Sequence, residues 1–451
     1  MPTPVTVRRE DEIDRILQAL RDSHCISIVG LSNMGKSTLI RSLLATDVVD
    51  RYTHVANRQA VFIYIDCNGM LELSGQGFYE LILRAVQQNI DEVDLLSHVA
   101  EHYQKVVEPD SQFMVPFSFN SAMTTVIEEG DRDVILLLDE FDEAFDSLDA
   151  RVLLNLRHMK DRYPRNLIYI TATVRRLGSR RFDEQTAEFI EMFASATFYL
   201  GPLKRAEADE LVRGLAAHAG VTDEISEHEL DFMWEQTGGH PRLLRAAVSQ
   251  LAELLHETEA SGAPITDNFE TVLDYFLHDA TIRTECSRLI GQLAPDERQA
   301  LGQIATGSAE QLSPTMITAL LRWGLIEMEE GEPSIFADLL FEFLRRQARV
   351  EQEDGLWVDH DAGEVWVEGA STPALTELEF KLMSLLFERR NKLTDKYQIV
   401  ETVWGVEYID EVDDARIEKL VSRLRSKVEP DSGSPRYITT VRGRGYKLIT
   451  P

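Results

Sequence analysis

The sequence is poor in cysteine and lacks long uninterrupted runs of apolar residues. Its three cysteines, Cys25, Cys67 and Cys286, form no C-x-x-C pair, so we expect neither a disulfide framework nor a cysteine zinc site. No apolar run approaches the roughly 18 residues of a membrane span, and the N-terminus has no apolar signal-peptide core. These absences predict a cytoplasmic protein that makes no use of a membrane.

Positive charge is also scarce. The chain has 46 Lys and Arg residues against 77 Asp and Glu residues, which gives a net charge of −31. Such an excess argues against non-specific binding of nucleic acid by the molecule as a whole, although it leaves room for a local basic face. The length of 451 residues predicts three or more domains, at roughly 100–200 residues each.

Apolar strands alternate with amphipathic helices over the first 200 residues. This alternation predicts a parallel α/β sheet with right-handed crossovers. From residue 204 to about residue 280 the pattern is helical throughout, which indicates a helical lid. The expected strands are 25–29, 61–66, 133–140, 166–173 and 196–201, and the expected helices are 9–21, 37–45, 78–90 and 148–163.

A phosphate-binding pattern, G-x-x-x-x-G-K-S, occupies residues 30–37 between the first expected strand and the following helix. Its glycines permit a turn whose backbone N–H groups converge on phosphate oxygens at a helix N-terminus. Lys36 would reach the β- and γ-phosphates, and Ser37 would coordinate Mg²⁺. We expect ATP or ADP to contact Gly30, Ser32, Asn33, Met34, Gly35, Lys36, Ser37 and Thr38.

Two carboxylates end the buried strand 133–138. Asp139 would hold Mg²⁺ directly or through water, and Glu140 would act as the general base toward the attacking water. Taken alone, the pair could equally be exposed carboxylates at a strand end. The phosphate-binding turn about 100 residues upstream favours the catalytic interpretation.

Residues 5–350 resemble the STAND branch of the AAA+-related ATPases, on the segments VRREDEI (7–13), LLLDEFDE (136–143) and TGGHP (237–241). The resemblance implies that Arg9 lies near the nucleotide, that Pro241 touches adenine and that Arg242 senses phosphate. It also implies a polar sensor of the γ-phosphate at the end of the fourth strand, where Thr171 and Thr173 are both candidates and we select Thr173.

For several residues near this site the sequence leaves two roles open. Arg242 could instead be a solvated helix arginine, and His240 is expected to be a turn or cap residue without a catalytic role. Arg175, Arg176, Arg180 and Arg181 are either surface arginines or candidates for a finger that reaches a neighbouring subunit.

Residues 356–451 resemble the winged-helix DNA-binding domain of OmpR/PhoB-type response regulators. The resemblance rests on LTELEFKLMSLL (375–386), IVETVWG (399–405), RIEKLVSRLRSKVEP (416–430) and YITTVRGRGYKL (437–448). It includes a leading hairpin around Asp361-Ala362-Gly363. Residues 416–451 contain nine basic and three acidic residues, a local charge of +6.

The basic residues of helix 416–428 share one face, opposite the apolar residues Ile417, Leu420, Val421 and Leu424. The resemblance implies that Lys419 and Arg423 face bases of double-stranded DNA and that Arg442 enters a minor groove. The alternative is a solvated helix, or a winged helix used for protein contacts. The full expected DNA-binding set is Arg416, Lys419, Arg423, Arg425, Thr440, Arg442 and Arg444, of which Arg425, Thr440 and Arg444 would hold phosphates.

We therefore predict a multidomain chain: an α/β P-loop ATPase core (1–203), a helical lid (204–284), a structural winged helix (285–350) and an OmpR/PhoB-type winged helix (351–451). The middle winged helix carries an acidic hairpin around residues 329–332 that would repel DNA. A short acidic linker is expected at 351–354.

The function predicted from these parts is a STAND-type switch that binds and slowly hydrolyses ATP with Mg²⁺ and regulates transcription in a prokaryotic cell. An ATP-dependent homo-oligomer would belong to such a switch. Two alternatives stay open: a DNA-loading or DNA-remodelling ATPase of the replication or transposition type, and an antiviral sensor ATPase.

Overall fold

The computed structural model describes residues 5–220, 225–261, 269–352, 355–359, 363–367, 370–405 and 412–449. The chain divides into two compact units. The first comprises Met1–Pro264, Ser287–Glu297 and Ser313–Asp338, and the second comprises Ile265–Cys286, Arg298–Leu312 and Leu339–Pro451. This division runs through the segment 285–350, so the predicted domain boundaries stay predictions.

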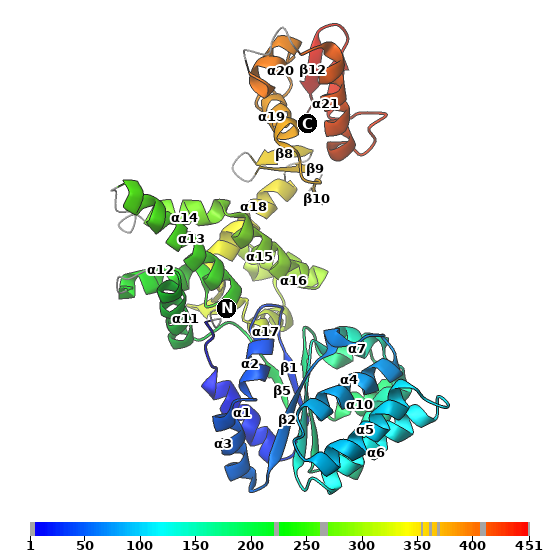
Figure 1. Ribbon diagram of the computed structural model, residues 1–451. Coiled ribbons are helices and arrows are strands. Elements are labelled where there is room, and N and C mark those ends of the chain that lie inside the picture. Colours follow the sequence, from blue (N-terminus) through cyan, green and yellow to red (C-terminus); the bar gives the residue numbers. More distant parts are fainter. Residues whose placement is uncertain are drawn as a thin grey trace. The chain divides into compact units, whose positions relative to one another are not determined.

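A five-stranded parallel sheet forms the centre of the first unit, with the order β2-β3-β4-β1-β5 (Figure 1). All seven residues of β3 and of β4 are buried, as expected for strands covered on both faces. The parallel α/β prediction is confirmed, with small shifts at strand ends. The strands are β1 (Ile26–Val29), β2 (Ala60–Asp66), β3 (Asp133–Asp139), β4 (Leu167–Thr173) and β5 (Thr197–Tyr199).

Helices pack on both sides of this sheet, with α1 to α3 on one side and α4 to α6 on the other (Figure 1). The structure adds several helices at positions without an expected element, among them α3, α5 and α6. The helices up to β5 are α1 (Glu10–Arg21), α2 (Lys36–Ser42), α3 (Thr46–Ala56), α4 (Gly75–Gln88), α5 (Val93–Val107), α6 (Met114–Glu128), α7 (Phe141–Ser147), α8 (Ala150–Arg162), α9 (Leu177–Arg180) and α10 (Glu184–Glu191), with a short 3-10 turn at Cys67–Gly69.

Between β5 and residue 280, the regular elements of the described residues are all helices, which agrees with the helical pattern expected there. These helices are α11 (Arg205–His218), α12 (Glu227–Thr237), α13 (Pro241–Ser261) and α14 (Phe269–His278). The next segment contains α15 (Ala280–Gly291), α16 (Pro295–Ala305), a 3-10 turn (Ala309–Gln311), α17 (Pro314–Trp323), β6 (Ile326–Glu329), β7 (Glu332–Ile335) and α18 (Asp338–Gln352).

The predicted acidic hairpin is present. Strands β6 and β7 pair antiparallel, and Glu330 and Gly331 both have positive φ, as a two-residue hairpin turn requires. The predicted linker 351–354 is wrong in its first half, because helix α18 continues to Gln352. Residues 353–354 lie outside the described part of the chain.

The C-terminal segment has its own apolar core, built on Leu382, Leu386, Ile399, Leu420 and Leu424. A three-stranded antiparallel sheet precedes it, although Asp361-Ala362 of the expected hairpin turn lies outside the described residues. The elements are β8 (Leu356–Asp359), β9 (Glu364–Val367), β10 (Ala370–Ser371), α19 (Glu377–Glu388), α20 (Lys396–Val403), α21 (Asp414–Val428), β11 (Ile438–Val441) and β12 (Gly445–Leu448).

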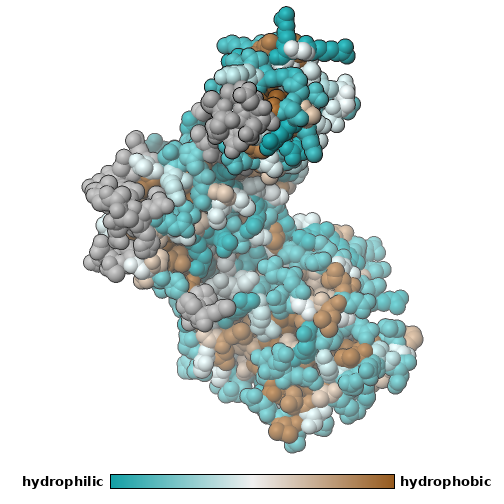
Figure 2. Space-filling model, turned by 45° about the horizontal axis from the view of Figure 1, so that its top comes forward, coloured by the Kyte–Doolittle hydropathy of each residue, from teal (hydrophilic) through white to brown (hydrophobic). Residues whose placement is uncertain are grey.

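The visible surface is mostly hydrophilic, with small groups of apolar side chains over the α/β part (Figure 2). This agrees with the net charge of −31. None of the described helices is both long and apolar enough to cross a membrane.

Candidate nucleotide site and nucleic-acid interface

The phosphate-binding turn joins β1 to α2 at the carboxyl end of the sheet. Gly30 lies so close to the residue after β5 that a Cβ there would be 2.6 Å from the Leu200 carbonyl oxygen. Gly35 caps α2 with a φ of 91°, a conformation that favours glycine. Both glycines of the motif are therefore required by the backbone, and the turn leads into a helix N-terminus as predicted.

Lys36 and Glu140 face a pocket of about 240 Å³. The Lys36 ammonium donates to the carbonyl oxygens of Gly30 and Leu31, at 2.8 and 3.2 Å. Burial lowers the pKa of Lys36 and raises that of Glu140, and their mutual attraction opposes both shifts. The pocket is lined by Asn33, Gly35, Lys36, Ser37, Thr38, Glu140, Pro241, Arg242 and Arg245.

This lining brings most of the predicted nucleotide contacts into one place and joins the turn to the lid. Arg245 was not predicted. It lies one helical turn after Arg242 on α13, so helical spacing was the signal that could have found it. Two arginines beside a phosphate-binding turn suit a polyanionic ligand.

The residues at this end of the sheet also fit a magnesium ion. Asp139 is buried at the end of β3, and Ser37 lines the pocket. Among the described residues no cluster of three or more His, Cys, Asp or Glu side chains could hold a metal by itself. In nucleotide sites Mg²⁺ keeps waters and phosphate oxygens and uses one or two protein ligands.

Thr173 ends β4 beside the phosphate-binding turn. Its backbone carbonyl accepts a bond from the Gly30 N–H at 3.1 Å. Its hydroxyl is buried and has no hydrogen-bond partner. A buried orphan hydroxyl at this position can donate to a ligand oxygen. The Thr171 hydroxyl, on the same strand, is also buried without a partner, so the sensor role of Thr173 stays a prediction.

Arg9 is placed differently from the expectation of a direct nucleotide contact. Its guanidinium donates to the carbonyl oxygens of Met34, Gly201 and Pro202, at 2.7 to 3.2 Å. Arg9 is buried and does not line the pocket. It therefore braces the phosphate-binding turn against the chain after β5, and its predicted contact with nucleotide stays a prediction.

His240 caps a lid helix. Its Nδ1 accepts a bond from the Leu243 N–H, the third residue of α13, and Pro241 starts the helix. Burial, followed by the charge of Arg9, lowers the pKa of His240 to about 3. The histidine is thus a neutral cap at the first turn of α13, as predicted.

The segment Ser287–Glu297 contacts two parts of the nucleotide site. The Ser32 N–H donates to Gln292 Oε1 at 2.6 Å, and Arg175, two residues beyond Thr173, donates to the Gln292 carbonyl oxygen at 2.8 Å. Arg175 also makes a two-pronged ion pair with Glu297, at 2.9 and 2.6 Å. Its guanidinium lies 4.7 Å from the centre of the Trp323 ring. We call Arg175, Gln292, Glu297 and Trp323 the latch.

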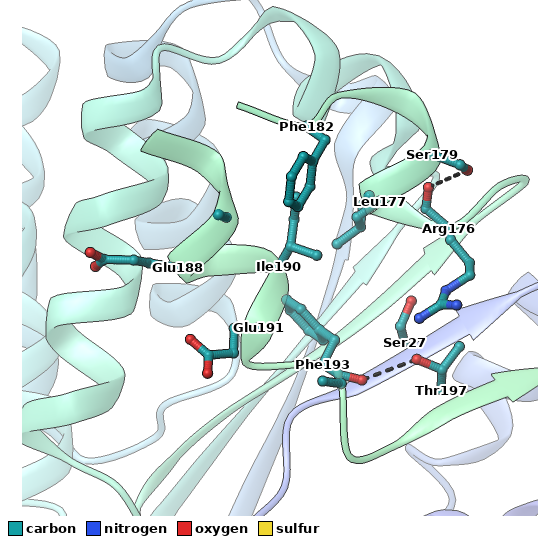
Figure 3. A pocket seen from close by; sticks show the side chains of 13 residues that line it. Ser27, Arg176, Leu177, Ser179, Phe182, Glu188, Ile190, Glu191, Phe193 and Thr197 are labelled. Carbon is teal, nitrogen blue, oxygen red and sulfur yellow. Dashed lines mark hydrogen bonds between the residues drawn. The ribbon is translucent and has the colours of Figure 1, made fainter. Parts of the chain in front are cut away.

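The other candidate finger arginines differ from one another. Arg180 pairs with Asp142 and Asp146, and Arg181 pairs with Asp183. Arg176 is exposed and lines a second cavity of about 640 Å³. In Figure 3 the side chains of Phe182, Ile190 and Phe193 gather at this cavity. No residue of the phosphate-binding turn lines it, so it is separate from the nucleotide pocket.

Helix α21 presents the expected basic face. Arg416, Lys419 and Arg423 are exposed. Ile417, Leu420, Val421 and Leu424 are buried in the core of the segment. One face therefore packs while the other is available to a major groove.

Not every basic residue of α21 is available for contact with DNA. The Lys427 ammonium donates to the buried carboxylate of Glu379 at 2.8 Å, so this residue holds α21 against α19. Burial acts to raise the pKa of Glu379, but the bonds from Lys427 and Thr376 outweigh it and the pKa is lowered. Arg425 donates to the Ile438 carbonyl and to the Thr440 hydroxyl, which ties α21 to β11.

A tight turn, the wing, joins β11 to β12. Gly443 and Gly445 have φ values of 70° and 136°, and a Cβ at 445 would be 2.2 Å from the Thr394 carbonyl oxygen. Tyr446 is buried, with Arg425 over its ring. Arg442 and Arg444 are exposed at the tip, where they can reach nucleic acid.

Two family models match the chain. The one described as Novel STAND NTPase 1 matches residues 7–304, about two thirds of the chain, and includes the phosphate-binding turn, Asp139, Glu140 and the start of α13. The chain belongs to this STAND NTPase family. The second, described as the C-terminal domain of transcriptional regulatory proteins, matches residues 370–448. The STAND NTPase thus carries an OmpR/PhoB-type DNA-binding domain.

Curated relatives match this C-terminal domain. Response regulator ArlR of Staphylococcus saprophyticus is 39% identical over 105 residues, which are 23% of this chain and 46% of ArlR. The uncharacterized transcriptional regulatory protein YrkP of Bacillus subtilis is 36% identical over 108 residues, again 23% of this chain and 46% of the relative. The chain spans less than half of the length of these relatives.

Solved structures resemble each part separately. The Walker-type ATPase of Pyrococcus abyssi is 14% identical, with a TM-score of 0.45, over 76% of this chain and 99% of that chain. The DNA-binding domain of Klebsiella pneumoniae RstA, solved with the RstA box, is 26% identical, with a TM-score of 0.20, over 22% of this chain and 94% of that chain. Both scores are too low to support an argument, so the fold assignment rests on the sheet order and the family matches.

Proposed function

We propose that this STAND NTPase is a slow ATPase switch whose nucleotide state sets how its C-terminal domain binds double-stranded DNA, with regulated transcription as the output. The observation that supports it most is the latch. Gln292 binds the phosphate-binding turn, and Glu297 holds the arginine that follows the sensor strand. A ligand that changes the turn or this arginine would therefore change how the segment 287–297 is held.

The residues around the pocket have distinct roles in this proposal. Lys36 leaves its two carbonyl partners and binds the β- and γ-phosphates, while Arg242 and Arg245 offset the remaining phosphate charge. Ser37 and Asp139 would hold Mg²⁺, which neutralises charge on the phosphates when bound. Glu140 takes a proton from the attacking water, and its raised pKa makes it a better base than a solvated carboxylate.

Through the latch, nucleotide binding would also change how the segment 287–297 is held. Arg175 is bound to Glu297 in this structure, and a γ-phosphate at the end of β4 would compete for the same guanidinium. ADP has no such group, so the ADP form would keep the latch closed. Release of the latch in the ATP form would expose surfaces for homo-oligomer assembly and change DNA occupancy.

Substitution of Glu297 tests this coupling. Glu297→Gln keeps the shape and an acceptor for the Trp323 N–H but removes the charge that holds Arg175. We expect the variant in ADP to bind DNA about as tightly as the unaltered protein in ATP. Glu101→Gln, which breaks an exposed helix ion pair with Lys105, is the matched control. An unchanged difference between ADP and ATP in Glu297→Gln would contradict the switch.

Selection of bound DNA from a random pool, in ATP and then in ADP, tests the output. A single enriched sequence family in ATP supports transcription regulation. A ring-shaped assembly with DNA-stimulated turnover would favour DNA loading instead, and the absence of any enriched sequence would favour an invader sensor.

A further inference from the structure

Tyr64 and Asp139 lie on neighbouring strands and on the same face of the sheet. The parallel register pairs Asp66 with Asp139 and Tyr64 with Leu137. Residues 64 and 66 point to the same side of β2, so Tyr64 is the diagonal neighbour of Asp139, within reach of a long aromatic side chain. Its hydroxyl lies 2.8 Å from Asp139 Oδ2.

The Asp139 carboxylate is held at both oxygens. Oδ2 accepts from the Tyr64 hydroxyl, and Oδ1 accepts from the Glu140 N–H at 3.0 Å. The side chain is buried, so these two bonds fix its orientation. Each oxygen retains a further lone pair for another donor, such as a metal-bound water.

Arg41 decides which way the Tyr64 hydroxyl points. The Arg41 guanidinium stacks over the Tyr64 ring at 4.9 Å and donates to the hydroxyl oxygen at 2.9 Å. Because that oxygen accepts from Arg41, its own hydrogen is directed to Asp139.

This arrangement connects the two halves of the nucleotide site. Arg41 belongs to α2, the helix that begins with Lys36 and Ser37, and Asp139 ends β3. We propose that Tyr64 is a positioning residue that orients the Asp139 carboxylate toward the magnesium of the bound nucleotide, and that Arg41 orients Tyr64. The proposal rests on the role of Asp139 in the proposed function, and it adds residues outside the pocket lining.

The opposite end of β3 provides a matched control. There the Tyr52 hydroxyl donates to the buried carboxylate of Asp133, also at 2.8 Å, in a network with Asn166 and Arg58. Tyr52→Phe therefore removes the same kind of bond from the same strand, far from the phosphate-binding turn. A purely structural role for Tyr64 predicts that the two tyrosine variants behave alike.

The test compares metal binding in the full-length protein. Mn²⁺ is titrated into the ADP-bound protein and followed by electron paramagnetic resonance, and ADP affinity is measured in EDTA. We expect Tyr64→Phe to weaken Mn²⁺ binding by roughly tenfold, with unchanged ADP affinity in EDTA. Tyr52→Phe should bind Mn²⁺ as the unaltered protein does. Arg41→Gln should produce a smaller loss than Tyr64→Phe, because the hydroxyl remains.

Three further results decide the outcome. Equal Mn²⁺ affinities for Tyr64→Phe and Tyr52→Phe would overturn the positioning role. If Tyr64→Phe does not fold, an unchanged Mn²⁺ affinity in a folded Arg41→Gln variant would overturn it as well. Asp139→Asn separates this inference from the proposed function: if Asp139→Asn binds Mn²⁺ normally, the metal-binding role of Asp139 is wrong, whatever Tyr64 does.

Discussion

At the residue scale, the roles proposed for Lys36 and Glu140 separate nucleotide binding from hydrolysis. We expect Lys36→Ala to abolish nucleotide binding, because it removes the buried cation at the phosphate-binding turn. Glu140→Gln keeps the size of the side chain and should retain ATP while turnover falls by roughly 10²–10⁴-fold. Equilibrium binding of a fluorescent ATP analogue and single-turnover hydrolysis measure the two effects. Normal hydrolysis by Glu140→Gln would disprove the general-base assignment.

His240 makes stability depend on pH. Its pKa in the folded protein is about 3, against roughly 6.5 when unfolded, so the unfolded chain binds the extra proton between these values. The contribution of His240 to the free energy of unfolding should therefore be fully present above pH 6.5. Below that pH the free energy of unfolding should fall, by up to about 1.4 kcal/mol per pH unit from this residue. His240→Asn retains a helix cap without a titrating ring. Urea unfolding at pH 7, 6 and 5 should show a shallower loss in the variant.

At the element scale, helix α21 is expected to contact DNA through Arg423 and to pack against α19 through Lys427, one turn further along. Arg423→Ala should weaken specific DNA binding by roughly 1–3 kcal/mol if the side chain contacts a base, without loss of fold. Lys427→Ala removes the 2.8 Å ion pair of the buried Glu379 carboxylate and leaves it only the longer contact with Arg423, at 3.8 Å, so this variant should instead lower the unfolding temperature. Gel-shift titration and thermal unfolding of both variants distinguish these effects. The same loss of DNA binding in both variants would contradict these separate roles for Arg423 and Lys427.

Whether the sequence alone could predict a feature depends on how far apart along the chain its residues lie. The phosphate-binding turn, the wing glycines and the faces of α21 are local patterns, and the structure has them. The contacts of Tyr64 with Asp139, Arg175 with Glu297 and Ser32 with Gln292 join residues 75, 122 and 260 positions apart. No periodicity connects such residues, because only the folded sheet and the segment 287–297 bring them together.

Some elements could have been predicted and were not. Helix α5 has Leu95, Val99 and Val106 buried at helical spacing, a pattern that the sequence alone displays. Arg9 shows the opposite case. The family resemblance implies that it lies near the nucleotide, and only the structure shows that its bonds go to three backbone carbonyls.

At the scale of the whole molecule, charge is divided unevenly along the chain. Residues 416–451 carry a charge of +6 within a chain of −31, so the remainder repels DNA. We expect residues 350–451, which have their own core, to bind DNA more tightly than the full-length protein in ADP. ATP should reduce the difference. Fluorescence anisotropy at several salt concentrations measures both affinities, and equal values in ADP would contradict this expectation.

The latch contains an indole. Trp323 donates its N–H to Glu297 at 3.0 Å and lies under the Arg175 guanidinium. Both neighbours are charged, and both would change if a nucleotide drew Arg175 away. The emission of this tryptophan should therefore shift with nucleotide state, and Trp323→Phe would identify its share among the five tryptophans of the chain. If its emission shifts in this way, Trp323 would serve as an intrinsic optical reporter of bound nucleotide, and mixing experiments could follow the proposed switch without any attached dye.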